Sequence, residues 1–146
     1  MTEIRAYRET DEAKVADLWK AVFRNPPSWN EPRLDIQRKL AVQRELFFVA
    51  VAGEDVLGTV MAGYDGHRGW VYYVGVDPAH RRQGIGAALM RRVEEELDAR
   101  GCPKLNLQVR ASNPGAVDFY RRLGYSVEDR VSMGKRLGER AKRNGT

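Results

Sequence analysis

The chain has 146 residues, of which 42% are hydrophobic and 31% are charged. This length suits one domain with one core, and the share of apolar side chains excludes an intrinsically disordered protein. One cysteine and two histidines exclude an intrachain disulfide and a zinc site built on several cysteines. With 25 basic and 20 acidic residues the net charge is +5, which suits an anionic ligand, a nucleic acid or an acidic protein surface.

The sequence carries no sign of a membrane segment. No apolar run approaches the ~20 residues that a membrane span needs, and the first residues, MTEIRAYRETDE, lack the apolar stretch of a secretory signal. We therefore expect a cytoplasmic protein without membrane association. Because the sequence contains no repeat or linker, we expect one domain over residues 1–137. Residues 138–146 are expected to form a basic, loosely held tail.

The first third of the chain predicts a strand followed by two helices. A period-two alternation around Ile4 predicts a strand over residues 3–8. Thr10 or Asp11 is expected to cap a helix that has an apolar stripe at three- and four-residue spacing, and a weaker helix is expected over 31–43. The stripe consists of Val15, Leu18, Trp19, Val22 and Phe23, and the cluster expected to end the helix is Asn25-Pro26-Pro27.

Three antiparallel strands are expected next. Compact apolar runs occupy residues 46–52 and 56–64, and the turn Gly53-Glu54-Asp55 between them predicts a hairpin. A second turn at 65–69 leads into the apolar and aromatic run WVYYVGV at 70–76. Strands joined by such short turns run antiparallel.

A helix is predicted after the third of these strands. Arg100, a cation in the last turn, and Gly101 just past it favour the end of this helix. The strand predicted over 104–109 is joined to the strand at 70–76 through the helix, so these two strands should be parallel. The apolar residues on one face of the helix are Ile85, Leu89, Val93 and Leu97.

The remaining elements complete a mixed sheet. Asn113 and Pro114 are a helix cap and a proline at the first helical position, and that helix is expected to end at Gly124. A last strand is predicted from Tyr125 to about Leu137. We therefore expect an α/β (α+β) fold, with a mixed, mostly antiparallel sheet that contains a parallel central pair and is flanked by helices. An exposed sheet edge after Tyr125 would permit a homodimer.

The loop in front of the central helix reads Arg81-Arg82-Gln83-Gly84-Ile85-Gly86. A glycine-bearing loop that opens a helix aims unpaired backbone N–H groups at one point, with the positive end of the helix dipole behind them. Because the arginines add positive charge, this loop is a candidate phosphate site. The alternative is a tight strand-to-helix connection whose arginines face solvent. The spacing matches neither the dinucleotide-binding G-x-G-x-x-G nor the P-loop, which requires G-K-[ST].

These residues resemble the signature of the GNAT superfamily of acyl-coenzyme-A-dependent N-acyltransferases. That signature is Arg or Gln-x-x-Gly-x-Gly or Ala after a strand, and Arg81, Gly84 and Gly86 fill its three specified places. The resemblance extends over the segments VYYVGVDPAHRRQGIGAALM and ASNPGAVDFYRRLGY. With the first strand and helix, it covers about residues 3–137.

The resemblance implies that acetyl-coenzyme A is the acetyl donor and that no metal takes part. The strand matching Val74, Gly75 and Val76 would pair with the pantetheine arm of the cofactor, and Asn113 would contact the same arm. Gly75 also fits a packing need opposite a bulky neighbour, and Asn113 also fits a helix cap. The residues implied to hold the pyrophosphate are Arg81, Arg82, Gln83, Gly84, Ile85, Gly86 and Ala87.

Two positions bear on the chemistry. Tyr120 matches the tyrosine that in many members protonates the departing thiolate, and a phenol of pKa ~10 suits this role. On helical periodicity alone, Tyr120 belongs to the core with Phe119 and Leu123. Gln108 occupies the position where the similar ribosomal-protein alanine N-acetyltransferases carry a glutamate, and glutamine cannot act as a general base. Substitute candidates for the base are Glu31, Asp35, Asp65 and His67, and candidates to line an acceptor pocket are Trp29, Tyr72 and Tyr73.

The resemblance implies acetyl transfer to a primary amine of a small molecule or of a peptide or protein N-terminus, by direct attack in a ternary complex. Cys102 is a poor covalent carrier because it follows a helix C-terminus, where the dipole disfavours a thiolate. Two other functions stay open. The first is a non-catalytic acyl-coenzyme-A sensor, which the missing glutamate at Gln108 favours. The second is RNA-directed acetylation, such as that of an aminoacyl-tRNA, which the basic surface favours. For the amine acetyltransferase itself, no nucleic acid partner is expected.

Overall fold

The structure is a computed structural model that describes residues 2–23 and 31–138. The chain divides into two compact units, Met1–Gln108 and Val109–Thr146, and each is described by itself. One domain over residues 1–137 therefore stays a prediction, and nearly all of the predicted tail lies outside the described residues. No helix in the described ranges is long and apolar enough to cross a lipid bilayer.

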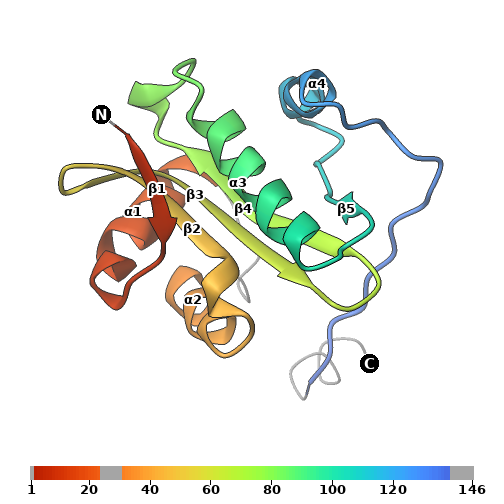
Figure 1. Cartoon of the computed structure of the whole chain (residues 1–146), viewed down its shortest axis with the longest axis horizontal. Helices are drawn as coiled ribbons and strands as arrows, with labels where there is room; N and C mark the ends of the chain where they lie inside the picture. The colour runs from red at the N-terminus through yellow and green to blue at the C-terminus, as the bar shows by residue number, and fades with distance from the viewer. Residues whose placement is uncertain (1, 24–30, 139–146) are drawn as a thin grey trace. The chain divides into compact units, whose positions relative to one another are not determined.

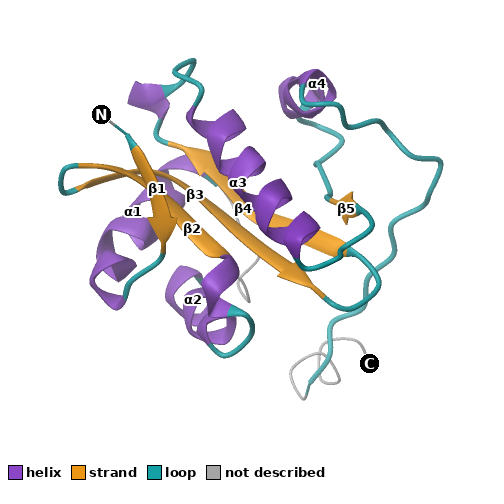
Figure 2. Cartoon of the chain, in the orientation of Figure 1, coloured by secondary structure: helices purple, strands orange, loops and turns teal. Residues whose placement is uncertain are grey.

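A five-stranded sheet forms the centre of the first unit (Figure 1, Figure 2). The strand order is β1-β2-β3-β4-β5, with antiparallel pairing from β1 to β4 and parallel pairing between β4 and β5. This arrangement confirms the predicted mixed, mostly antiparallel sheet with one parallel pair. The pair was expected at the centre, but in the described sheet β5 is an edge strand, so the pair lies at one side. The strands are Glu3–Ala6 (β1), Phe47–Ala52 (β2), Asp55–Tyr64 (β3), Gly69–Val76 (β4) and Leu105–Asn106 (β5).

Helices cover both faces of this sheet. Figure 1 shows α3 on one face and α1 and α2 on the other. The predicted apolar stripe of α3 is buried, with no member more than 5% exposed, and Gly101 ends the helix in the left-handed conformation at φ +81°. The helices of this unit are Glu12–Val22 (α1), Pro32–Leu40 (α2) and Ile85–Ala99 (α3).

The predicted first helix forms, but its cap differs from the prediction. Asp11 occupies the N-cap position of α1, yet its side chain makes no hydrogen bond to the helix. Instead it accepts hydrogen bonds from the Arg5 guanidinium at 2.8 and 2.9 Å and from the Arg8 N–H at 2.8 Å. Asp11 therefore joins β1 to the start of α1. The Asn25-Pro26-Pro27 cluster that was expected to end this helix lies outside the described residues.

β5 is shorter than the strand predicted over residues 104–109. It pairs with β4 only at Gly69 and Trp70. An alternating apolar pattern reports which side chains are buried, but it does not report whether the backbone has a neighbouring strand. As a result, the part of β4 at 71–76 pairs with β3 alone in the described sheet.

The described residues of the second unit, 109–138, contain one helix, α4, at Pro114–Arg122. The strand predicted from Tyr125 to Leu137 is wrong, because no strand forms within the described residues of this unit. The apolar side chains of this segment are not buried, since Val131, Met133 and Leu137 are 85–91% exposed. No hydrophobic burial therefore offsets the loss of conformational entropy that ordering a strand requires. The sheet edge that would have permitted a homodimer is therefore also absent from the described part of the chain.

Candidate active site

The connection from β4 to α3 is a tight surface loop. A 3-10 turn at Pro78–His80 follows β4, and the Asp77 carboxylate accepts a hydrogen bond from the Ala79 N–H at 2.9 Å. Arg82 at φ +64° and Gly84 at φ +78° then adopt the left-handed conformation. This conformation costs glycine little and is uncommon for arginine. The loop thereby changes direction within a few residues and starts α3.

The N-terminus of α3 is open. Gly84 is the N-cap, and no side chain caps the helix among the residues that the structure describes. The first helical hydrogen bond runs from the Ala88 N–H to the Gly84 carbonyl at 3.0 Å, so the three N–H groups between them have no partner inside the helix. Such an end, with the positive end of the helix dipole, favours an anion. All seven predicted pyrophosphate residues lie here: Arg81, Arg82, Gln83, Gly84, Ile85, Gly86 and Ala87.

Strand β4 leads into this loop and ends with Val74, Gly75 and Val76, which were predicted to face the pantetheine arm. A Cβ atom on Gly75 would lie 2.9 Å from Phe23 Cζ and 3.2 Å from Val22 Cγ1. Packing against the end of α1 therefore requires a glycine here, which was the alternative reason for this residue. This requirement does not depend on a bound ligand.

A β-bulge lies just before Gly75. Two residues of β4, Tyr73 and Val74, oppose a single residue of β3, and Tyr73 has φ +53°. The Thr59 hydroxyl donates to the Tyr73 carbonyl at 2.8 Å and accepts from Trp19 Nε1–H at 2.9 Å. The Trp19 ring also stacks on the Tyr73 ring, with centroids 3.8 Å apart. These contacts fix both the backbone and the side chain of the bulge.

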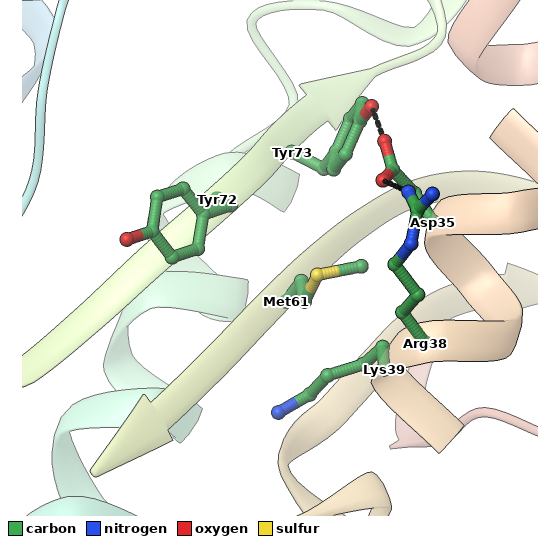
Figure 3. A pocket seen from close by; sticks show the side chains of 6 residues that line it. All are labelled: Asp35, Arg38, Lys39, Met61, Tyr72 and Tyr73. Carbon is green, nitrogen blue, oxygen red and sulfur yellow. Dashed lines mark hydrogen bonds and ion pairs between the residues drawn. The ribbon is translucent and has the colours of Figure 1, made fainter. Parts of the chain in front are cut away.

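The Tyr73 side chain forms one wall of a cavity of about 420 Å³ between α2 and the strands β3 and β4 (Figure 3). Its hydroxyl donates to Asp35 Oδ2 at 2.5 Å, and Asp35 Oδ1 accepts from Arg38 Nη1 at 3.1 Å. Burial and the neighbouring Asp35 carboxylate raise the pKa of Tyr73. The residues that line the cavity are Asp35, Arg38, Lys39, Met61, Tyr72 and Tyr73.

The model of the acetyltransferase (GNAT) family matches residues 13–125. The match covers most of the chain and includes β4, the loop before α3, and α4. The chain belongs to the acetyltransferase (GNAT) family. This finding confirms the resemblance that the two sequence segments carry.

Individual GNAT relatives agree with this assignment. A protein from Sodalis glossinidius (strain morsitans) named acetyltransferase is 47% identical over 138 residues, which are 94% of this chain and 96% of that protein. The ribosomal-protein-S18-alanine N-acetyltransferase from Escherichia coli is 26% identical, with a TM-score of 0.72 over 85% of this chain and 77% of that chain. The aminoglycoside N-acetyltransferase AAC(6')-Iy, solved in complex with CoA, shares the fold, with a TM-score of 0.77, 19% identity and coverage of 93% of this chain and 95% of that chain.

The second unit carries the other two residues that the GNAT resemblance singles out. The Asn113 side chain accepts a hydrogen bond from the Ala116 N–H at 3.1 Å, which confirms that Asn113 caps α4. The Tyr120 ring makes edge contacts with Phe119 and Tyr125, with centroids 4.9 and 5.9 Å apart. Burial raises the pKa of Tyr120 to about 12, so this phenol keeps its proton at neutral pH. Tyr120 therefore packs with its neighbours and carries its proton, and its role as the acid stays a prediction.

Gln108, which stands where similar enzymes carry a glutamate base, is exposed just beyond β5. The substitute candidates for the general base lie in different places, and the first of them, Glu31, caps the N-terminus of α2. Asp65 accepts the N–H of His67 at 2.8 Å, and backbone hydrogen bonds of this turn lower the pKa of Asp65. Asp35 alone of the substitute candidates lines the cavity beside the β4 bulge.

The structure brings two of the three residues predicted to line an acceptor pocket to one cavity. Tyr72 and Tyr73 both line the cavity, although neighbouring residues of a regular strand point to opposite faces, because the bulge interrupts the alternation. Trp29 lies outside the described residues. A signal for the cationic lining was available, since two basic residues follow Asp35 at spacings of three and four on one helix face. The lining residues that the sequence reasoning missed are Arg38, Lys39 and Met61.

Proposed function

We propose that this GNAT protein transfers an acetyl group from acetyl-coenzyme A to a primary amine, by direct attack in a ternary complex. The observation that carries the proposal is the open N-terminus of α3, with exposed Arg81 and Arg82 directly before it. Coenzyme A contains a pyrophosphate, and unpaired helical N–H groups with arginines beside them suit this anion. The structure of a relative of the same fold in complex with CoA supports the choice of ligand.

Strand β4 supplies the next part of the donor site. At Val74–Val76 one edge of β4 has no neighbouring strand in the described sheet, so its N–H and C=O groups are available to a ligand. The amide groups of the pantetheine arm are suited to pair with such an edge as an added strand does. Because β4 runs directly into the loop, the arm and the pyrophosphate would bind to consecutive parts of the chain. We assign Asn113 to the same arm.

The transfer step requires one proton donor for the leaving group. The amine nitrogen attacks the thioester carbon, the C–N bond forms, and the C–S bond breaks with its electron pair going to sulfur. We assign Tyr120 as the group that gives its proton to the coenzyme A thiolate. The amine loses one proton to water, and that proton restores the phenol after product release.

The acceptor must be an amine that loses its proton readily, because Gln108 cannot remove it. An α-amine has a pKa of ~7.8 and a lysine side chain ~10.4, so a far larger fraction of an α-amine is neutral at pH 7. We therefore propose an α-amine as the acceptor group.

The replacement Gly86→Val tests the pyrophosphate site. Gly86 is the second residue of α3, where a branched side chain would lie between the helix N–H groups and the phosphate oxygens. We expect the affinity for coenzyme A to fall at least ~10-fold, which is ~1.4 kcal/mol. Calorimetric titration of the folded variant measures this change.

Gly134→Val is the control and should leave the affinity for coenzyme A unchanged. A Cβ on Gly134 would meet no atom within 4 Å, and Gly134 is not assigned to the donor site. Unchanged affinity in Gly86→Val would refute the assignment of the pyrophosphate to this loop. A sensor without catalysis would bind acetyl-coenzyme A but give no acetylated product by mass spectrometry with any amine of a broad panel.

A further inference from the structure

The cavity beside the bulge contains a positive charge that no carboxylate of the cavity offsets. Asp35 and Arg38 form an ion pair at 3.1 Å, and the Tyr73 hydroxyl donates to the other oxygen of Asp35. Lys39 donates to the Ala62 carbonyl, and no ion pair to Lys39 forms within the described ranges 2–23 and 31–138. Lys39 therefore supplies the surplus positive charge of the cavity.

The surroundings of Lys39 favour an anionic partner for its ammonium. Burial lowers the pKa of Lys39, because the charged form has lost part of its contact with water. Glu45 acts on Lys39 electrostatically, but the Glu45 carboxylate is itself paired with Arg100 at 3.0 Å. A carboxylate that enters the cavity would form a charge-assisted hydrogen bond with this ammonium.

The Asp35 end of the cavity suits a neutral amine. Arg38 offsets the charge of Asp35, so this end has no net charge that would hold an amine in its protonated form. Each oxygen of Asp35 has a further lone pair, so the carboxylate can accept an N–H of the amine while it keeps its two present partners. Tyr73 directly precedes Val74, the first residue of the β4 edge assigned to the pantetheine arm. The amine end therefore adjoins the proposed donor site along the chain.

Two spacings keep the amine end apart from the Lys39 end. Asp35 and Lys39 are one turn apart on α2, which places their Cβ atoms ~5–6 Å from each other. On the sheet, Ala62 pairs with Val71, which lies two positions before Tyr73 on β4, a length of ~6–7 Å of strand. Figure 3 shows the amino group of Lys39 pointing away from the Asp35–Tyr73 pair. A carboxylate on the same carbon as the amine is too close to it to reach Lys39.

We propose that the acceptor is the α-amine of a peptide with an acidic side chain in its first two residues, the amine lying at Asp35 and the side-chain carboxylate at Lys39. This inference rests on the proposed acetyl transfer. In a peptide the α-carboxyl group of the first residue is in amide linkage, and the α-amine has a pKa of ~7.8, so it loses its proton readily. Met61 lies between the two ends and offers contact to the carbon atoms that join the amine to the carboxylate.

Contacts within the protein hold the walls of the cavity in place. The Tyr73 ring is stacked on Trp19, and helix α2 is fastened to α1 by Glu12, which accepts from Arg33 at 2.5 Å and from Gln37 at 3.0 Å. The volume of about 420 Å³ lies in the range of small-molecule sites, ~300–1,000 Å³. The cavity is therefore large enough for the first residues of a peptide, and the rest of the peptide would extend out of it.

The test compares acceptors that differ in one charge. Glu-Ala-Ala-amide is assayed beside Gln-Ala-Ala-amide, and Ala-Glu-Ala-amide beside Ala-Gln-Ala-amide, so the members of each pair share their shape and their α-amine. We expect the glutamate peptide of at least one pair to show a kcat/KM ~10-fold or more above that of its glutamine partner. In Lys39→Met this preference should fall to about threefold or less, because the charge is lost. Lys20→Met, which replaces an exposed lysine of α1, should leave the preference unchanged.

Two results would overturn the inference. The parent enzyme could acetylate both members of each pair equally, which would uphold the acetyl transfer and refute the acidic acceptor, or Lys39→Met could keep the full preference. The preference is a ratio within one protein sample, so partial unfolding of a variant cancels from it.

If no peptide is acetylated, calorimetric titration of the same pairs in the presence of coenzyme A decides. Tighter binding of a glutamate peptide that is lost in Lys39→Met would support the acidic site and refute the transfer of an acetyl group to its occupant. Equal or absent binding of the two members of each pair would refute the site.

Discussion

Replacement of Tyr120 by phenylalanine is expected to lower kcat about 100-fold and to leave the affinity for acetyl-coenzyme A unchanged. The variant keeps the ring and its edge contacts with Phe119 and Tyr125 but removes the only proton that this side chain can give. Without a donor, the thiolate must leave as an anion, which raises the barrier of the step in which the C–S bond breaks. Steady-state kinetics and calorimetric titration together separate the loss of rate from a loss of binding.

Tyr125→Phe is the matched control for this experiment. It removes the hydroxyl of a tyrosine in the same ring cluster, so it reports any general effect of a lost phenol. If Tyr120→Phe keeps its rate within about twofold of the parent, Tyr120 is not the acid. If both variants lose rate equally, the ring cluster rather than one proton donor is responsible.

The sequence predicted those parts of the site that depend on local rules. The start of α3 was predicted from the glycine-bearing loop before it, and the buried face of α3 from an apolar residue at every fourth position. The Asn113 cap of α4 has the same origin, since capping involves residues only three apart. Such interactions form between neighbours along the chain, so they can be predicted from the local sequence without knowledge of the fold.

The parts that were missed depend on contacts between distant segments. The length of β5 is set by how far two strands stay paired, and the alternation in one of them contains no information on this. Lys39 and Met61 come from α2 and β3, and only the packed fold brings them to one cavity with Tyr72. The positive φ of Tyr73 could not be predicted from the sequence either. A non-glycine residue is held in that conformation by contacts with the rest of the fold, and these are not visible in the local sequence.

These surroundings are themselves open to a test through Thr59. Its hydroxyl is completely buried and joins Trp19, which is 1% exposed, to the bulged backbone at Tyr73. In Thr59→Val the side chain keeps its size, but the buried Trp19 N–H and the half-buried Tyr73 carbonyl each lose a hydrogen-bond partner. A buried group without a partner costs ~1–3 kcal/mol, so we expect the free energy of unfolding to fall by about 2–4 kcal/mol. Urea denaturation followed by tryptophan fluorescence measures this quantity.

Thr59→Ser separates the hydrogen bonds from the packing. Serine keeps the hydroxyl and loses one buried methyl group, for which a loss of only ~1 kcal/mol is expected. A larger loss of unfolding free energy in Thr59→Val than in Thr59→Ser would show that the two hydrogen bonds, rather than the volume of the side chain, hold the bulge. Equal losses, or a loss below ~1 kcal/mol in Thr59→Val, would contradict this account.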